Sequence, residues 1–343
     1  MRLYIDKGNI ESFVQSAASR PNEFEKCNLM LKKHFDMHLN LSKQDFAQSE
    51  LCMSWANTLL DGRGKNLIHL NAPTNIFPSR PINTTTFGDG FNEQQNSSVY
   101  LLEDSAIVST LEAKGNYIVG DTGKEIDTLL QLMIGDDDEL YTQSLPLQQH
   151  FATGNWNGLN NSVLPCADII ISDSYILSNP SLYAKNLIGF LNKITDLVGQ
   201  SHINIVIFCL FETEYRGAMQ SPNWSNVRNN IKYELGLVHI DASVTFVAPM
   251  TERDFEEHDR TVCTNYLYYV SGASLNFYDP RGNFTTRGRH FHVQSMAKSQ
   301  HHDEALAFIH DMQTLINEIE SGVKNGIIDK DPSPKLSNFL HFS

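Results

Sequence analysis

The chain has 343 residues, of which 41% are hydrophobic and 19% are charged, and its formal net charge is −14. This length predicts two domains, with one large domain as the alternative. The negative charge argues against broad, sequence-independent attraction to DNA, RNA or anionic membranes, although a local basic groove is compatible with it.

The cysteines and the first residues indicate a cellular compartment. Five cysteines lie far apart, with no Cys-x-x-Cys pair, which is typical of reduced thiols rather than of a disulfide framework. Residues 1–7 contain no apolar run long enough for a signal peptide, and no segment is apolar enough to span a bilayer. The sequence therefore predicts a cytoplasmic protein without a membrane span.

Residues 1–160 mix short apolar runs with segments of helical spacing, and they are expected to form an α+β domain of unknown type. Residues 61–98, rich in Asn, Thr, Pro and Gly, predict a long loop that is either functional or mobile. Helices are expected at 10–17, 27–35, 43–60 (with Ser42 as N-cap) and 124–134, and strands at 3–5, 99–102 and 117–119.

A Gly- and Asn-rich segment at 154–162 is expected to separate this domain from a second one at 163–322. There, apolar strands alternate with helices, which is the pattern of an α/β sheet. Strands are expected at 167–173, 203–210, 243–248, 261–270 and 273–278, and helices at 180–198, 224–238 and 303–322. Residues 323–343, with Pro332 and Pro334, are expected to be a loosely attached tail.

One polar stretch lies between the third and fourth of these strands. In an extended segment, His258 and Arg260 project to the same face, and Asn265 needs a bend to join them. Ligands of open α/β sheets gather at the carboxyl ends of strands, where Asp173 and Tyr175 follow the first strand of the domain. We expect one crevice to hold Asp173, His258, Arg260 and Asn265. The alternative is that Asp173 caps a turn and His258 bonds a loop.

The spacing of this stretch resembles a known signature. His258-x-Arg260-x4-Asn265, followed by Gly272-Ala273-Ser274-Leu275-Asn276, is similar to the phospholipase D motif His-x-Lys-x4-Asp with Gly-Ser-x-Asn. Arginine stands here for lysine and asparagine for aspartate, and the second part is one residue longer. Residues 165–280 are closest to the phospholipase D-like domain that follows microtubule-interacting and trafficking (MIT) domains.

The resemblance implies a phospholipase D-like mixed sheet flanked by helices, and a metal-independent reaction without a cofactor. His258 would attack phosphorus, with Arg260, Asn265 and Asn276 as the other catalytic residues. Since the chain has one such motif, a homodimer would supply the second histidine. Asn265 cannot carry the negative charge of the usual aspartate, which implies weaker catalysis. The phospholipase D-like domains that follow MIT domains in eukaryotic proteins are generally regarded as binding domains rather than hydrolases, which implies the same.

The most basic stretch of the chain follows the motif. Arginine forks match phosphate oxygens, so Arg281, Arg287 and Arg289 are expected to bind substrate together with Asp173, Tyr175 and Ser274. A solvated loop is the simpler alternative. A zinc site formed by nearby histidines is a third possibility, although their sequence separations match no familiar zinc-binding motif. It would use His290, His292, His301 and His302.

Two principal functions follow from these observations. The first is a phosphodiesterase, expected to be a nuclease effector of a prokaryotic defence or conflict system, with nucleic acid or another phosphodiester as substrate. The second is a catalytically inactive phospholipase D-like module that binds a phosphorylated ligand or a partner protein. A metal-dependent hydrolase built on the four histidines is the third.

Overall fold

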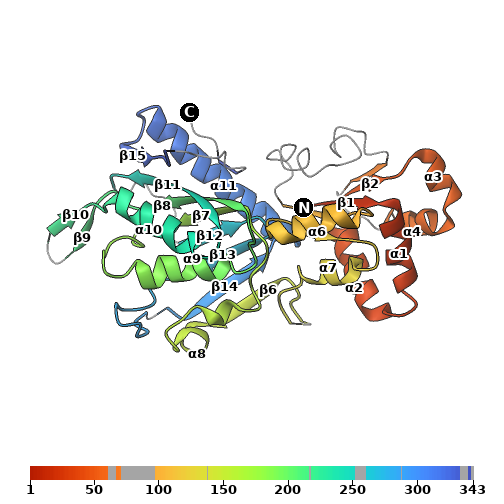
Figure 1. The fold of residues 1–343 in the computed structure, drawn as a ribbon, viewed down its shortest axis with the longest axis horizontal. Helices are drawn as coiled ribbons and strands as arrows, with labels where there is room; N and C mark the ends of the chain where they lie inside the picture. Colours follow the sequence, from red (N-terminus) through yellow and green to blue (C-terminus); the bar gives the residue numbers. More distant parts are fainter. Residues whose placement is uncertain are drawn as a thin grey trace. The chain divides into compact units, whose positions relative to one another are not determined.

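The computed structural model describes residues 1–60, 67–70, 97–136, 138–215, 218–251, 260–286, 288–332 and 339–340. They form an α/β protein with two large sheets flanked by helices (Figure 1). The chain divides into two compact units. Unit 1 is Met1–Met133 with Ser295–Asp303, and unit 2 is Ile134–Gln294 with Glu304–Ser343. Within the described part of the chain, no helix combines the length and apolarity needed to cross a membrane.

Unit 1 contains a five-stranded parallel sheet in the order β3-β2-β1-β4-β5. Its strands are β1 Arg2–Asp6, β2 Asp36–Asn40, β3 Ile68–Leu70, β4 Ser98–Leu101 and β5 Ile118–Gly120. Its helices are α1 Lys7–Ser16, α2 Pro21–His34, α3 Lys43–Gln48, α4 Glu50–Leu60, α6 Ser105–Lys114 and α7 Glu125–Leu130. A capping box at Ser42 starts α3, as the sequence predicts, but Ser49 separates α3 from α4.

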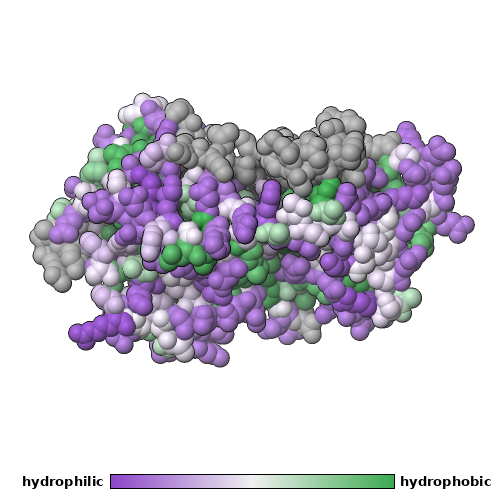
Figure 2. All heavy atoms as spheres, in the orientation of Figure 1, coloured by the Kyte–Doolittle hydropathy of each residue, from purple (hydrophilic) through white to green (hydrophobic). Residues whose placement is uncertain are grey.

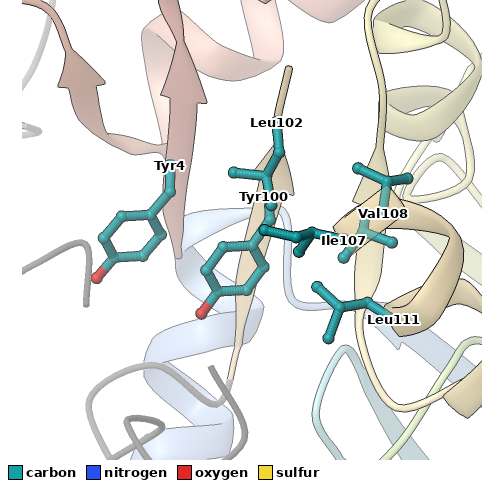
Figure 3. Close-up of a cluster of buried hydrophobic side chains, with 7 residues drawn as sticks. Tyr4, Tyr100, Leu102, Ile107, Val108 and Leu111 are labelled. Carbon is teal, nitrogen blue, oxygen red and sulfur yellow. The ribbon is translucent and has the colours of Figure 1, made fainter. Parts of the chain in front are cut away.

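Figure 3 shows how one face of this sheet is covered. Tyr4 and Tyr100, on neighbouring strands, stack with 5.2 Å between their ring centroids. Beside them, α6 contributes Ile107, Val108 and Leu111 to a buried cluster. Leu3 and Ile5 alternate with Tyr4 along β1 and therefore point to the opposite face, where they are fully buried. The parallel sheet is thus packed on both faces.

Unit 2 contains an eight-stranded mixed sheet in the order β15-β11-β8-β7-β12-β13-β14-β6. Only β7, β8 and β11 run parallel to one another among the pairs with known register. The strands are β6 Thr142–Pro146, β7 Asp168–Ser172, β8 His202–Phe208, β11 Asp241–Pro249, β12 Arg260–Thr264, β13 Leu267–Ser271, β14 His290–Ser295 and β15 Gly326–Asp329. A separate hairpin joins β9 Thr213–Tyr215 and β10 Ala218–Gln220.

Helices cover both faces of the larger sheet. Tyr268 and Tyr269 are consecutive in β13 and point to opposite sides; Tyr268 contacts Phe308 and Tyr269 contacts Phe190. The helical segments are α8 Leu147–Phe151, η2 Asn157–Leu159, η3 Ala184–Ile188, α9 Gly189–Ile194, α10 Trp224–Gly236 and α11 Ser299–Glu320. Phe190 belongs to α9 and Phe308 to α11, and α10 packs on β11.

Several boundaries differ from the sequence-based expectation. The single strand expected at 261–270 is the hairpin β12–β13, which turns at Asn265 and Tyr266. The strand expected at 273–278 is a loop with one isolated bridge, from Tyr278 to Phe284. The tail expected after 322 contains β15, which pairs with β11. The boundary lies before β6, earlier than the Gly/Asn segment, because β6 pairs with β14.

Candidate functional site

The candidate site lies at the carboxyl edge of the parallel part of the unit 2 sheet. Ser172 at the end of β7 pairs with Phe208 at the end of β8, and Phe208 pairs with Val247 of β11. The backbone N–H of Asp173 still donates to the Phe208 carbonyl, at 3.0 Å, so Asp173 is fixed directly past the ladder. This is the edge where open α/β sheets bind ligands.

Asp173 is a buried carboxylate, with 1% of its surface exposed. Its Oδ2 accepts hydrogen bonds from the Ser274 hydroxyl (2.8 Å) and the Leu275 N–H (2.7 Å), and its Oδ1 accepts one from the Tyr175 N–H (3.0 Å). Burial raises the pKa of Asp173 to about 6, although these hydrogen bonds and the charge of Arg260 pull the pKa down. Asp173 therefore fastens the loop after β13 to the end of β7.

Asn276 holds the same loop to the end of β7 through a second contact. Its Nδ2 donates to the Tyr175 carbonyl at 2.7 Å. Its Oδ1 is buried and has no hydrogen-bond partner among the described residues. Ser274 and Asn276 are thereby both held beside the end of β7, as the sequence predicts for residues of one site.

Arg260 brings a positive charge to the same place. Thr261 pairs with Ser172, so Arg260 lies opposite Asp173 on the neighbouring strand, and the two side chains share one face of the sheet. The guanidinium carbon is 5.9 Å from the centroid of the Tyr175 ring, within cation–π range, and Arg260 is partly exposed. The structure thus assembles Asp173, Tyr175, Arg260, Ser274 and Asn276.

Asn265 is not part of this cluster. It stands five residues beyond Arg260, roughly 16 Å along an extended strand. It is fully buried, and its Oδ1 accepts hydrogen bonds from the backbone N–H groups of Ala167 (2.7 Å) and Asp168 (3.1 Å). Asn265 therefore anchors the start of β7 at the far end of the sheet, and the expected crevice with Arg260 is wrong for this residue.

The expected basic patch is only partly described. His258 and Arg287 lie outside the described residues. Arg281 is exposed in a turn whose N–H groups bond the Asp279 carboxylate. A side chain at Gly288 would meet Ala273 Cβ at 3.0 Å, so the backbone before β14 lies against the site loop, and the exposed Arg289 follows it directly.

The four histidines of the alternative metal site fall into two groups. His290 and His292 share one face of β14, and their rings are 5.8 Å apart. His301 and His302 belong to unit 1, where His301 is buried and bonded to the Ser295 carbonyl (3.0 Å). Burial lowers the pKa of His302 to about 3. No group of three or more His, Cys, Asp or Glu suited to a metal ion occurs among the described residues.

Unit 2 also has an open groove of about 490 Å³ on another part of its surface. Trp156 lines it from the η2 side, Lys185 and Asn192 line it from η3 and α9, and Glu234 from α10. Figure 2 shows hydrophobic side chains among hydrophilic ones over α9 and α10. Leu197 and Leu237, just beyond the ends of these helices, are 50% and 59% exposed. The groove contains none of the residues that the sequence singles out.

The carboxyl edge of the unit 1 sheet carries polar residues that the sequence analysis missed. The strand order reverses direction between β1 and β4, which makes this edge a topological switch point. Asp6 ends β1, is 2% exposed, and accepts hydrogen bonds from Asn40 Nδ2 (2.8 Å) and the Glu103 N–H (3.1 Å). Glu103 in turn accepts one from the Gly8 N–H (2.6 Å).

A second carboxylate network lies in the same unit. Glu125 is 2% exposed and accepts from Asn9 Nδ2 (3.1 Å) and Ser12 Oγ (3.1 Å). Asn9 is fully buried in the first turn of α1, directly after β1, and its Oδ1 has no hydrogen-bond partner among the described residues. Asp6 and Glu103 directly follow predicted strands, which was the available signal. Because β2 was not predicted from the sequence, the strand order that brings Asp6 and Glu103 to the same edge could not be predicted either.

Comparison with known proteins adds no relative. No protein-family model matches the chain, and no curated protein matches its sequence.

Proposed function

We propose that unit 2 is a phospholipase D-like phosphodiesterase with His258 as its nucleophile, and that nucleic acid is its substrate. The observation that carries the proposal is the convergence of Arg260, Ser274 and Asn276 beside the end of β7. These residues supply a cation, a hydroxyl and an amide, which are the groups that recognise a phosphoryl oxygen. His258 precedes Arg260 by two residues.

In the proposed reaction, the His258 imidazole attacks phosphorus and the phosphodiester oxygen leaves as an alcohol. The leaving oxygen takes its proton from His258 of a second copy of the chain, so the active form is a homodimer. Water then cleaves the phosphorus–nitrogen bond and restores the histidine. Arg260 and Asn276 stabilise the charge on the phosphoryl oxygens. Asn265 takes no part, because it anchors the opposite end of the sheet.

The proposed biological setting is that of an effector in a prokaryotic defence or conflict system. The alternative is a catalytically inactive module that binds a phosphorylated ligand or a partner protein. One observation favours this alternative: the described residues of the site are suited to holding a ligand, and the buried acid, Asp173, is engaged in holding the loop. The two functions use the same groups and differ only in whether His258 reacts.

The test is cleavage of single- and double-stranded DNA and RNA by wild type and His258→Ala, with EDTA present throughout. A nucleophile contributes on the order of 10³-fold or more to the rate, so His258→Ala should have almost no EDTA-resistant activity. Equal EDTA-resistant activity in the two proteins would refute the phosphodiesterase. Absence of cleavage in both, with nucleic-acid binding that depends on Arg260, would establish the binding module instead.

A second candidate function belongs to unit 1, and the strand order favours it. We infer a divalent-cation site at its switch point, with carboxylate ligands from Asp6 and Glu103. Mg²⁺ needs only one or two carboxylates because water completes its coordination, so three acidic ligands are not required. Asp6 is buried at the end of β1 and accepts the Glu103 N–H at 3.1 Å, so the two carboxylate-bearing residues are neighbours at this edge.

Such a cation would make a hydrolase that EDTA inhibits. Cleavage that requires Mg²⁺, is lost in Asp6→Asn and survives in His258→Ala would assign the activity to unit 1. Cleavage that Asp6→Asn leaves unchanged would remove this candidate. The EDTA arm therefore separates the two units in one assay.

A further inference from the structure

The hydroxyl of Ser274 has the wrong polarity for an anion while Asp173 is ionised. A serine hydroxyl has one proton to donate, and Ser274 donates it to Asp173 Oδ2 at 2.8 Å. An ionised carboxylate is an acceptor only, so this bond has no other direction. Ser274 then turns only lone pairs towards a phosphoryl oxygen, which repels it.

The burial of Asp173 stabilises its protonated form relative to the carboxylate. It is 1% exposed, and burial penalises the charged form. Its pKa is raised to about 6 by this burial, even though Arg260 and the donors Leu275 and Ser274 oppose the shift. An anion that pairs with Arg260 neutralises a cation that favours ionised Asp173, and it adds a like charge nearby. Both effects raise the proton affinity of the acid further.

We propose that Asp173 and Ser274 form a proton-linked switch, in which Asp173 takes up a proton from solvent as an anion binds and Ser274 turns to donate to that anion. No covalent bond changes. The protonated Asp173 donates to Ser274 Oγ, so the hydrogen bond between the two residues reverses and the serine proton points to the ligand. Asp173 is a positioning residue, and the inference rests on the anion site proposed for unit 2.

The other groups around Asp173 keep their roles in both states. The Tyr175 and Leu275 N–H groups remain donors to the carboxyl. Cys209, at the end of β8, is a buried thiol whose pKa is raised by burial, so it stays neutral. Arg260 stays charged, and Glu212, the acid that follows β8, is exposed. The segment 273–276 contributes no charged side chain.

The experiment measures proton uptake on binding of sulfate, which keeps its two charges between about pH 5.5 and 7.5, so that only the protein titrates. Isothermal titration in two buffers of different ionisation enthalpy gives the number of protons. His258→Ala is the background protein, because it removes the histidine that precedes Arg260. Ser274→Ala is then added to it. Ser271→Ala is the matched control, since this serine at the end of β13 donates to the Ala273 carbonyl and not to Asp173.

In the background protein and with Ser271→Ala, we expect proton uptake near pH 7 and an affinity that rises about tenfold from about pH 7.5 to 5.5. Ser274→Ala should take up fewer protons and show a flatter pH profile. Sulfate binding that depends on Arg260 but has the same proton uptake with and without Ser274 would overturn the switch alone. Binding that does not depend on Arg260, or no binding, would overturn the anion site and the switch with it.

Discussion

The carboxyl edges of the two sheets differ in the charge that they present. In unit 2, the edge at the end of β7 places Arg260, Ser274 and Asn276 around one buried acid, Asp173. In unit 1, the edge at the end of β1 presents Asp6 and Glu103, and the hydrogen bonds described for them come from amide groups. Both proposed sites lie at the carboxyl ends of parallel strands, where open α/β sheets bind ligands.

The comparison indicates that the sheet topology determines where a site lies, and that the charge of the side chains at this edge determines which ligand it can bind. A guanidinium with a hydroxyl and an amide attracts a phosphoryl group. In unit 1, the carboxylates of the buried Asp6 and the exposed Glu103 attract a hard cation. The same edge geometry therefore supports an anion site in one unit and a cation site in the other.

The largest effect on stability is expected from magnesium at the unit 1 edge. A ligand at a hundred times its Kd stabilises the folded state by about 2.7 kcal/mol, so saturating Mg²⁺ should raise the unfolding temperature of wild type. Asp6→Asn should lose this response, and Glu23→Gln, which changes a partly exposed acid of α2, should keep it. Calorimetry with and without Mg²⁺ measures both. If Mg²⁺ raised the unfolding temperature of Asp6→Asn as much as that of wild type, the proposed cation site at the unit 1 edge would be wrong.

The next effect is a pH dependence of stability at Asp173. Its pKa is about 6 in the folded state and 3.8 as the ordinary value, so the folded state binds more protons between these values. Stability from this group is therefore highest at low pH and falls as pH rises through the window. Wild type should lose roughly 2 kcal/mol more than Asp173→Asn between about pH 4 and pH 7. Urea unfolding checks this, and parallel curves would contradict the buried, titrating acid.

The smallest effect separates anchoring from binding. Asn265→Ala leaves the Ala167 and Asp168 N–H groups without their buried acceptor, which should cost about 1–2 kcal/mol of unfolding free energy. Asn265→Asp keeps both acceptors but buries a carboxylate, so it should cost at least as much. Sulfate affinity should be unchanged in both variants. If Asn265→Ala bound sulfate more weakly at unchanged stability, Asn265 would be a residue of the anion site and not an anchor of β7.

The sequence predicts the apolar elements of the fold well. The runs at 167–173 and 203–210 are the central strands β7 and β8, because such runs fit a strand buried on both faces. It fails for β2, whose Asp36, His38 and Asn40 interrupt the apolar pattern, and for β6, which has three polar positions and a proline. These strands exist because long-range pairing with β1 and β14 outweighs local propensity.

The candidate site follows the same division. The order of elements placed Asp173 and Arg260 at one sheet edge, and the resemblance to the phospholipase D motif added Ser274 and Asn276 to the site. These predictions misplaced Asn265, since the hairpin turn at 265–266 sends the chain back and leaves that side chain at the opposite edge. The alternative that Asp173 caps a turn agrees with the Tyr175 N–H bond to its Oδ1. Its two bonds to Ser274 and Leu275, which hold the loop after β13, could not be predicted, because they depend on long-range packing.

The central claim is that the Arg260 edge of unit 2 binds a phosphodiester. Its most direct test is the affinity of a short single-stranded DNA for His258→Ala, which binds without cleaving, and for the same protein with Arg260→Glu. Lys324→Glu changes the charge equally at a lysine paired with Glu318 and is the control. We predict that Arg260→Glu weakens binding by about tenfold or more and Lys324→Glu by much less. Equal affinity of the Arg260→Glu and control proteins would contradict the account.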